Sequence, residues 1–572
     1  MESLWDSATR GDLVVAATAL GGVGAWLAAF LATAAGSLQP SVSWTALATG
    51  LVVAVAVARV PVARPSARRL TLAELLALAA FAAAGIRQFV SLLSEVSLLS
   101  ERGGVVLTLL PYNYGDLPLH WTYIAQMAGG ASFWPENPIL TGARLRYPLG
   151  VDLLAAAFVQ LGAALPTVLR VSGLAGTALA ALALRRWGGA FAVAGFLGAG
   201  GLAGFRIFLT GRLLDYQNAV EWKSLFLALF VPQRGFLLAL PAGLLLLWSW
   251  RRRLLRGEPA LSAWVEGVLW GTLPLVHLHS FAFVSLLWLV WAAGGGRWRP
   301  ALASLAVAFV PAAWATLQVM SGPSAAPLVG WSLGWTIGRA NPLLFLAVNF
   351  GLFLPLALGA LVVAIRERRR EELLVLGPSL ALFAALFVVR LAPWAWDNTK
   401  LMLWCYVALL PAIETLVLAR LRPGWRVVAL VLLFFSGAES IVAASAGRGQ
   451  RLDVFERDEY EAVCAAVAPL GRDERVATAQ AHNHPVALCG QPIVAGYAGH
   501  LWSYGLDSRA VVQGLERLMN GAGDYRAEGR ALGARYLFWG PRERLAFPAS
   551  KRPWEATTPL ASGRWGALYR LD

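Results

Sequence analysis

An acidic residue and a histidine four positions apart mark the segment Tyr114-Gly115-Asp116-Leu117-Pro118-Leu119-His120. If a helix begins at Leu117, Asp116 occupies its N-cap and His120 follows about one turn later. A carboxylate in this position can act as a general base or bind a metal ion, and a neighbouring histidine would keep it ionised. A helix cap with a histidine beyond it is the simpler interpretation, and the sequence leaves both open.

Aromatic and charged residues crowd the next stretch, which contains Phe133-Trp134-Pro135-Glu136 and Arg146-Tyr147-Pro148. Tryptophan and tyrosine at such positions are typical of the belt at a membrane–water interface. Aromatic faces beside carboxylates also suit sugar rings. Tyr147 is therefore a candidate binding residue.

Two further clusters carry groups that can bind phosphate. Gln233-Arg234 precedes an apolar run, where the guanidinium can either hold a phosphate or extend toward the lipid headgroups. His277-Leu278-His279 separates two short apolar runs, and two histidines at that depth are costly unless they are used. Because His-x-His alone is a weak zinc signal, we expect hydrogen bonds to a phosphate or sugar.

The segment Trp394-Ala395-Trp396-Asp397-Asn398-Thr399-Lys400 directly precedes another apolar run. A lysine at the edge of a span can simply extend its ammonium group to the interface. Asp397 and Asn398 beside two tryptophans offer more polar chemistry than an anchor needs. We expect this segment to be functional, with Lys400 binding the phosphate of a lipid.

The elements that must position these residues are membrane-spanning helices. Hydrophobic residues make up 58% of the chain and charged residues only 14%, and the mean hydropathy is +0.60. Runs of roughly 20 apolar residues, the length that spans a bilayer, recur as far as residue 446. The pattern predicts about thirteen spans, near 11–34, 43–63, 71–93, 167–184, 189–209, 235–250, 261–276, 280–295, 301–319, 343–364, 373–390, 401–419 and 427–446.

The net charge of +15 does not indicate a nucleic-acid partner, because the arginines form short clusters between apolar runs. Such clusters mark cytoplasmic loops, and the thirteen spans place all of them on one face. The N-terminus is then cytoplasmic and the C-terminal part lies outside. The six histidines and the three lysines (Lys223, Lys400 and Lys551) all fall on the outer side. We therefore predict that the working surface is the outer one.

Residues 1–446 thus form a membrane domain with a large outer loop, 98–148, and residues 447–572 form an outer α/β domain. Residues 149–165 are expected to form an amphipathic helix that lies at the outer interface or dips partway into the membrane. Loops that follow strands of an open sheet often bind ligands, which makes His482, His484, Tyr497 and His500 candidates. Cys464 and Cys489 can pair if this domain is exported, although two cysteines leave the question open.

The chain resembles the GT-C superfamily of membrane glycosyltransferases, specifically its bacterial members, which use sugars carried on polyprenyl phosphates. The resemblance lies in Gly115-Asp116 to His120, in Arg146-Tyr147-Pro148-Leu149, in Asp397-Asn398-Thr399-Lys400 and in the outer α/β domain. It implies an inverting sugar transfer in which Asp116 deprotonates the acceptor and His120 assists it. Arg234, Lys400 and Arg339 would stabilise the departing phosphate. The acceptor would be a glycan, a lipid or a protein of the cell envelope.

Two features depart from that family. Two spans precede the one that leads into the Asp116 loop, where the family usually has a single span. The second outer loop offers Asp215 and Glu221 but lacks the Asp-x-Asp of metal-dependent members, so the sequence does not support a required divalent metal.

Two other classes of function remain open. A transporter or flippase of lipid-linked saccharides should carry internal repeats and charges at the bilayer midplane. Glu414 and Glu439 lie in late spans, but no repeat is evident. A scaffold that merely displays the outer domain would not need the polar loops. The sequence favours an enzyme in the plasma membrane of a bacterium.

Overall fold

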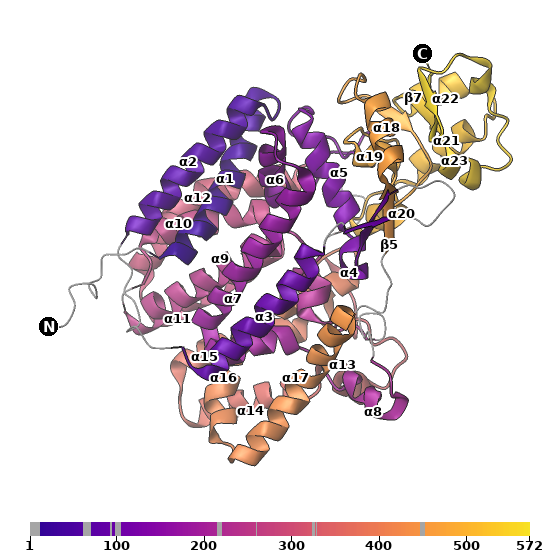
Figure 1. Cartoon of the computed structure of the whole chain (residues 1–572). Helices are drawn as coiled ribbons and strands as arrows, with labels where there is room; N and C mark the ends of the chain where they lie inside the picture. Colours follow the sequence, from indigo (N-terminus) through magenta and orange to yellow (C-terminus); the bar gives the residue numbers. More distant parts are fainter. Residues whose placement is uncertain are drawn as a thin grey trace.

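The computed structural model describes residues 12–60, 70–91, 94–97, 105–213, 220–258, 260–322, 327, 329–446 and 452–571. A bundle of helices makes up most of the molecule (Figure 1). The C-terminal segment, coloured orange to yellow, forms a separate α/β layer at one end of this bundle. The arrangement agrees with a polytopic helical membrane protein that carries an α/β domain.

Eight helices of the described ranges are long and apolar enough to span a membrane. A ninth span is possible if two helices that are bent by 88° at a short break, α13 (Pro342–Phe350) and α14 (Phe353–Arg366), count as one. The eight are α1 (Leu13–Ala35), α2 (Pro40–Arg59), α3 (Leu72–Val90), α7 (Leu165–Gly198), α11 (Leu278–Gly295), α12 (Trp298–Met320), α16 (Thr399–Leu416, with a short turn at each end) and α17 (Pro423–Ala446).

Every predicted span coincides at least in part with a helix, but the count of thirteen is not confirmed. Three of the matching helices are too short to pass as spans by length and composition: α9 (Phe236–Trp250), α10 (Ala263–Val276) and α15 (Arg370–Ala385). The predictions for 167–184 and 189–209 meet within the 34-residue helix α7. Helical geometry breaks there at Gly188 and Gly189, and the φ of +62° at Gly189 is one that glycine adopts without strain.

The arginine clusters are joined to one another by ion pairs between different elements. Arg185 lies 3.2 Å from Glu74 at the start of α3, and Arg251 lies 2.5 Å from Glu371 at the start of α15. Arg186 pairs with Asp12, and Arg420 pairs with Glu367. Within the described residues, these ion pairs join α7 to the start of α3 and the end of α9 to the start of α15.

The C-terminal domain contains a four-stranded sheet in the order β6-β7-β9-β8. Strands β6 and β7 are parallel, and the other two pairs are antiparallel. Outside these strands, Ile493 makes an isolated parallel bridge to Val476, and Ala495 makes an isolated antiparallel bridge to Leu140. The elements are α18 (Arg457–Val467), β6 (Arg475–Ala477), α19 (Pro485–Leu488), α20 (Ala498–Ser503), α21 (Arg509–Met519), α22 (Tyr525–Ala531), β7 (Ala534–Trp539), α23 (Pro541–Ala546), β8 (Ala561–Gly563) and β9 (Gly566–Arg570).

The first outer loop packs against this domain along its length. Strand β2 (Val105–Leu109) pairs with both β1 (Ser94–Ser97) and β5 (Leu452–Glu456), and β5 leads into the C-terminal domain. Further along the loop, Leu140 bridges to Ala495 of the C-terminal domain. Between β2 and Leu140, the loop forms the short helix α4 (Pro111–Tyr114) and α5 (Leu117–Ala128). The loop and the domain therefore form one outer layer.

The segment expected to lie at the interface or to dip partway into the membrane forms α6 (Gly150–Gln160), so the predicted helix is confirmed and its depth in the membrane stays a prediction. Leu153, Ala156 and Ala157 of this helix are fully buried, because it packs between α1 and α5. Its length of about 16 Å is too short to span a bilayer. Asp152 is also buried in this helix, and its ion partners hold α6 inside the protein.

Cys464 and Cys489 form a disulfide bond that joins α18 to the end of α19, and Cys405 is buried and unpaired. The bond closes a sequence separation of 25 residues. A cross-link over a loop of this size stabilises a domain by about 3 kcal/mol, chiefly by restricting the unfolded chain. Disulfides persist in oxidising compartments, in agreement with an exported domain.

We expect the double variant Cys464→Ser/Cys489→Ser to lower the melting temperature of the C-terminal domain, measured by near-ultraviolet circular dichroism of the full-length protein in detergent. Dithiothreitol should lower the melting temperature of the unsubstituted protein in the same way. The double variant should not respond to dithiothreitol. An equal response of both proteins would contradict a stabilising bond.

Candidate functional site

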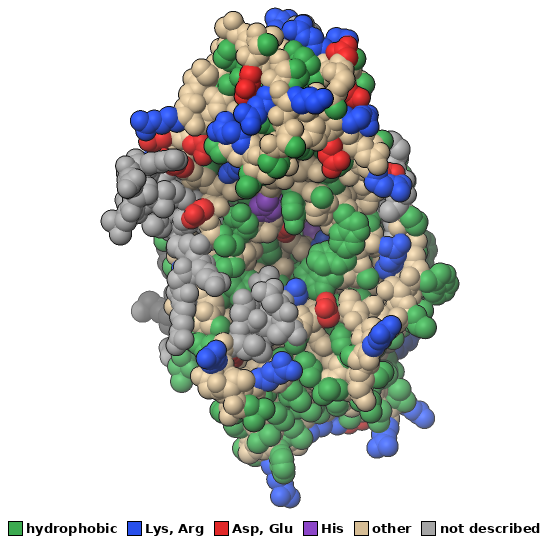
Figure 2. Space-filling model, turned by 90° about the vertical axis from the view of Figure 1, so that its right-hand side faces the viewer, with side chains coloured by type: hydrophobic (Ala, Val, Ile, Leu, Met, Phe, Trp, Pro, Cys, Tyr) green, Lys and Arg blue, Asp and Glu red, His purple; other side chains and the backbone are tan. Residues whose placement is uncertain are grey.

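A cavity of about 630 Å³ lies between the helical bundle and the C-terminal domain. Figure 2 shows this hollow beneath the domain, with histidine side chains at its back and hydrophobic side chains along its rim. Its wall is formed by segments far apart in the sequence. Its polar and aromatic lining residues include Asp116, Tyr123, Asn137, Arg146, Tyr147, Lys223, Gln233, His277, His279, Trp394, Trp396, Asp397, Lys400, His500, Ser503 and Tyr504.

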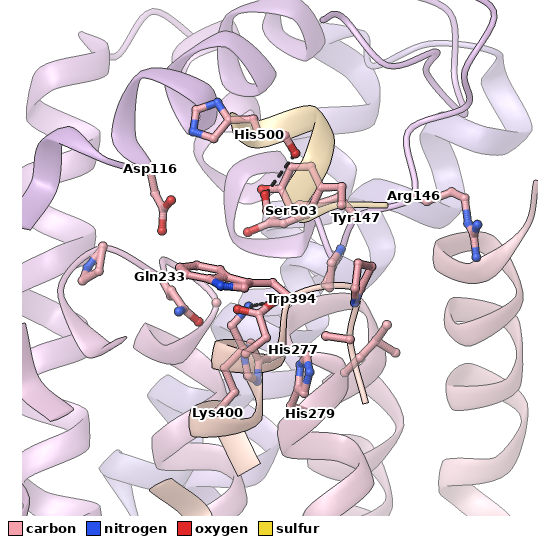
Figure 3. Close-up of a pocket in the computed structure, with 18 of the residues that line it drawn as sticks. Asp116, Arg146, Tyr147, Gln233, His277, His279, Trp394, Lys400, His500 and Ser503 are labelled. Carbon is pink, nitrogen blue, oxygen red and sulfur yellow. Dashed lines mark hydrogen bonds and ion pairs between the residues drawn. The ribbon is translucent and has the colours of Figure 1, made fainter. Parts of the chain in front are cut away.

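Asp116 provides a carboxylate at one side of the cavity (Figure 3). It occupies the N-cap position of α5, as predicted, but its side chain makes no capping hydrogen bond with that helix. Pro118 in the first turn lacks an N–H group, so one of the usual partners of a capping carboxylate is absent. The carboxylate is therefore turned toward the cavity rather than onto the helix.

His120 does not pair with Asp116, which corrects the predicted contact. Its Nδ1 lies 2.6 Å from Oδ2 of Asp152, and Nε of Arg234 donates to the other carboxylate oxygen at 2.9 Å. Arg234 also donates to the hydroxyl of Ser172 at 3.3 Å. His120, Asp152 and Arg234 are 2%, 2% and 3% exposed, so none is available to a substrate. We refer to these three residues as the buried triad.

The buried triad fixes the relative positions of three elements of the protein. Each member stands close in sequence to a residue of the cavity wall: His120 to Asp116, Asp152 to Tyr147, and Arg234 to Gln233. Breaking one side of a buried ion pair leaves a charge without a partner, at a cost of about 3–5 kcal/mol. The triad therefore joins α5, α6 and the turn before α9 beneath the cavity.

The opposite wall presents hydrogen-bond donors. The backbone N–H of Ser280 donates to Nδ1 of His277 at 3.2 Å, so in the neutral ring the hydrogen must lie on Nε2. The indole of Trp404 donates to the Ser280 hydroxyl at 2.9 Å, and that hydroxyl contacts His277 Nδ1 at 2.8 Å. This chain fixes the tautomer of His277 and supplies an N–H donor at the cavity wall, beside Gln233.

Lys400 and Asp397 form an ion pair of 3.1 Å at the start of α16, and both line the cavity. Lys400 lies beside His277 and His279 in Figure 3. Lys223 also lines the cavity, with its ammonium group 5.1 Å from the ring centre of Trp396. Two cations and several neutral donors therefore meet in this part of the wall, which suits an anion such as phosphate.

Aromatic rings form the middle of the cavity. Tyr147 lies 5.5 Å from Tyr123 and 5.6 Å from Tyr504, measured between ring centres. Burial raises the pKa of Tyr147 and Tyr504, so both hydroxyl groups stay protonated at neutral pH. Trp394 lies between the upper and lower groups of polar residues in Figure 3. Such rings with hydroxyl groups at their edges offer both stacking and hydrogen bonds to a sugar.

The C-terminal domain covers the cavity with α20, through His500 and Ser503 (Figure 3). His482 and His500 both contact the carbonyl oxygen of Gly115, next to Asp116. Tyr497 is 45% exposed and packs edge-on against both imidazoles. His484 instead lies in the core of the domain, where its Nε2 contacts Glu543 at 2.8 Å.

The cavity brings together most of the residues expected from the sequence, namely Asp116, Tyr147, Gln233, His277, His279, Asp397, Lys400 and His500. Five others are placed in structural roles or at the surface, which corrects the expectation for them. Besides His120, Arg234 and His484, Asn398 is one of these: its amide group holds the backbone carbonyls of Leu386 and Val389. Arg339 is exposed and is not among the cavity-lining residues of the described chain.

Sequence reasoning missed Asp152 and the α20 residues Ser503 and Tyr504. A single acid inside the apolar run of residues 150–160 was the available signal for Asp152, because a charge there requires a partner. Ser503 and Tyr504 gave no such signal, since their part in the cavity depends on how the domain docks.

Among the described residues, no group of three or more histidine, cysteine, aspartate or glutamate side chains is placed to hold a metal ion. Asp215 of the second outer loop lies outside the described residues. Lys400 and Lys223 give the cavity wall positive charge, and neutral side chains add hydrogen-bond donors.

Neither protein-family models nor curated proteins match this chain. Solved structures of an oligosaccharyltransferase from Archaeoglobus fulgidus resemble it. The form tethered to an acceptor peptide with an NVT sequon has a TM-score of 0.46 and 12% identity, over 82% of this chain and 69% of that one. The complex of this enzyme, AglB, with an inhibitory peptide and a dolichol-phosphate has a TM-score of 0.38 and 14% identity, over the same shares.

A third structure of the same oligosaccharyltransferase, a complex with Zn and sulfate, has a TM-score of 0.37 and 13% identity, over 81% of this chain and 68% of that one. Because the TM-scores are below 0.5, the activity of this chain is argued from its own site.

We expect Arg234→Ala to lower the thermal stability of the purified protein strongly, because it leaves Asp152 charged and buried without its main partner. Differential scanning fluorimetry in detergent measures the effect. The exposed Arg339→Ala serves as the matched control and should leave the melting temperature unchanged. Equal melting temperatures for the two variants would show that the triad does not hold these helices together.

Proposed function

We propose that this protein is a membrane glycosyltransferase that moves a sugar from a polyprenyl-phosphate donor to an acceptor hydroxyl at the outer face of a bacterial plasma membrane. One observation carries the proposal. A cavity at the end of the helical bundle holds a carboxylate at one side and lysines with neutral N–H donors at the other. Such a site matches a reaction that removes a proton from one group and releases a phosphate from another.

Asp116 is the general base of the proposed reaction. It is the cavity-lining carboxylate without a cationic partner in the described structure, whereas Asp397 is paired with Lys400. A carboxylate that reacts as a base must be open on the substrate side, and Asp116 makes no capping bond with its own helix. Trp394 lies between this carboxylate and Lys400 in Figure 3, and in this proposal the sugar is held against its ring.

Lys400 and the Nε2–H of His277 bind the phosphate in this proposal, with Gln233 beside them. Their positive charge and hydrogen bonds stabilise the charge that grows on the phosphate as it departs. Asp397 orients the lysine through the ion pair of 3.1 Å. Arg234 and Arg339 take no part, since one is buried with Asp152 and the other lies away from the cavity.

The reaction is a single displacement at the anomeric carbon. Asp116 accepts the proton of the acceptor hydroxyl, and the new bond forms between the acceptor oxygen and the anomeric carbon. The bond from that carbon to the phosphate oxygen breaks, and its electron pair leaves with the phosphate. Attack from the side opposite the leaving group inverts the configuration of the sugar.

A lipid-linked donor fits the apolar part of the cavity wall. Val319 and Met320 from the end of α12 line it, together with Phe281 and Ala282 from α11. Both helices are candidate spans, so the prenyl chain can lie against them while its phosphate reaches the lysines.

We expect Asp116→Asn to reduce sugar transfer by a factor of at least about 10³, in line with losses on removal of a catalytic base. The measurement is release of polyprenyl phosphate from a panel of radiolabelled undecaprenyl-phosphate hexoses and pentoses, by the protein in nanodiscs with cell-envelope extract as acceptor. Asp507→Asn, on the surface of the C-terminal domain, is the matched control and should transfer normally. Normal transfer by a well-folded Asp116→Asn protein would refute the role.

We expect Lys400→Met to weaken binding of undecaprenyl phosphate by about tenfold, because a charge-assisted contact of roughly 1.5–3 kcal/mol is lost. Microscale thermophoresis of the nanodisc protein measures this affinity. The exposed Lys551→Met changes the same residue type outside the cavity and should bind as the unsubstituted protein does. Unchanged affinity in Lys400→Met would place the phosphate elsewhere.

A further inference from the structure

Two histidines of the C-terminal domain meet at one backbone atom of the first outer loop. Nε2 of His482 lies 2.7 Å from the carbonyl oxygen of Gly115, and Nε2 of His500 lies 3.1 Å from the same oxygen. Gly115 directly precedes Asp116, the proposed base. His482 lies in the turn before α19 and His500 lies in α20, 18 residues apart by their numbers (500 − 482), so this contact depends on how the whole domain is docked.

The chemistry of the contact fixes both imidazoles. A carbonyl oxygen only accepts hydrogen bonds, so each ring must carry its hydrogen on Nε2. A carbonyl oxygen has two lone pairs, and two donors satisfy both. The Nδ1 of His482 is buried without a hydrogen-bond partner in the described structure. Neither ring is therefore placed to take part in proton transfer through Nε2.

Ring packing holds the pair in place. Tyr114 stacks on His482 at 4.8 Å between ring centres, with 22° between the planes. Tyr497 packs edge-on against His482 at 5.5 Å and against His500 at 5.4 Å. The two imidazoles are themselves 5.1 Å apart. The Gly115 carbonyl thus rests on a group of four rings, three of which belong to the C-terminal domain.

We propose that His482 and His500 are positioning residues that hold the Gly115–Asp116 backbone and so aim the Asp116 carboxylate into the cavity. This inference rests on the proposed function only for the role of Asp116, since the contact itself concerns the placement of the backbone. It gives the C-terminal domain a defined part in the site. Gly115 has no side chain that could fix the start of α5. The two histidines of the domain hold its carbonyl oxygen instead.

We refer to the contact of His482 and His500 with the Gly115 carbonyl as the clamp, and its stability depends on pH. Burial lowers the pKa of His482 and of His500, and the charge of Asp116 opposes this shift for both. The titratable groups that face the pair are Asp116 and His120 of α5, Tyr114 of α4, and Tyr497. An imidazole that is exposed to water takes up a proton near pH 6.5, whereas the two rings held against Gly115 do so only at lower pH. The clamp is therefore complete above about pH 6.5 and weakens as the pH falls through the lowered pKa values, where two cations 5.1 Å apart would repel.

Hydrogen–deuterium exchange of the full chain in nanodiscs tests the clamp without any substrate. The amides of Asn113, Tyr114, Leu119 and His120 are hydrogen-bonded within the segment around Gly115. In His482→Ala/His500→Ala, we expect these amides to exchange at least about tenfold faster. The matched control is His484→Gln, a neighbouring histidine that faces the domain core, and it should leave this segment protected. Unchanged exchange in the double alanine variant would overturn the proposal, whatever the protein catalyses.

Activity then separates positioning from simple folding. With the undecaprenyl-phosphate sugar that the protein uses, the double alanine variant should lose about 10- to 100-fold in kcat, because a small misplacement of a catalytic group has an effect of this size. Its KM for the donor should change less than about threefold, since the phosphate wall is untouched. A loss confined to KM would contradict the proposal. Absence of transfer by every variant, with faster exchange retained, would refute the proposed function and leave the clamp standing.

A conservative variant provides the last test. Glutamine places an amide N–H near the position of the imidazole Nε2–H but does not titrate. His482→Gln/His500→Gln should restore kcat to within about threefold of the unsubstituted protein at pH 7.5. Its kcat should also fall less steeply between pH 6.5 and pH 5.5. A pH profile that overlays that of the unsubstituted protein would contradict a role for these imidazoles in the acid limb.

Discussion

The buried triad of Asp152, Arg234 and His120 is the constraint on which the rest of the site depends. A carboxylate at 2% exposure cannot remain charged alone, so Arg234 and His120 must meet it from two other elements. This requirement brings the start of α5, the start of α6 and the turn before α9 to one point. Each of these elements presents its neighbouring residue to the cavity, which is how Asp116, Tyr147 and Gln233 come to line the same space.

The layer formed by the first outer loop and the C-terminal domain adds a second constraint on the site. The first outer loop pairs with β5 and bridges to Ala495, and its Gly115 carbonyl accepts hydrogen bonds from two histidines. Arg475 of the domain also contacts Glu136 of the loop at 2.9 Å. The proposed base therefore lies between a charged cluster in the bundle and a hydrogen-bonded contact with the domain. Neither layer encloses the cavity without the other.

Different kinds of side chain line different parts of the cavity. N–H donors and lysines lie toward the spanning helices, aromatic rings lie in the middle, and Asp116 lies at the outer side. A charged lipid head can reach the donors while its chain stays against α11 and α12, because both helices are apolar along their length. The His277 tautomer shows how far this wall is preorganised, since it depends on a hydrogen-bond chain from Trp404 through Ser280.

By itself, the sequence predicted a polytopic helical membrane protein with a C-terminal α/β domain, and it marked where most of the helices lie. These follow from local properties: apolar length, arginine clusters and turn-forming residues act over a few neighbours. It also marked Asp116, His277 and Lys400, because polar residues beside apolar runs are conspicuous. The tertiary structure decided what each polar residue does. Arg234 and His120 turned out to serve Asp152, and His482 and His500 turned out to hold Gly115, because these partners are 32 to 385 residues apart in the chain. Pairing over such distances depends on packing of the whole molecule, and no local pattern records it.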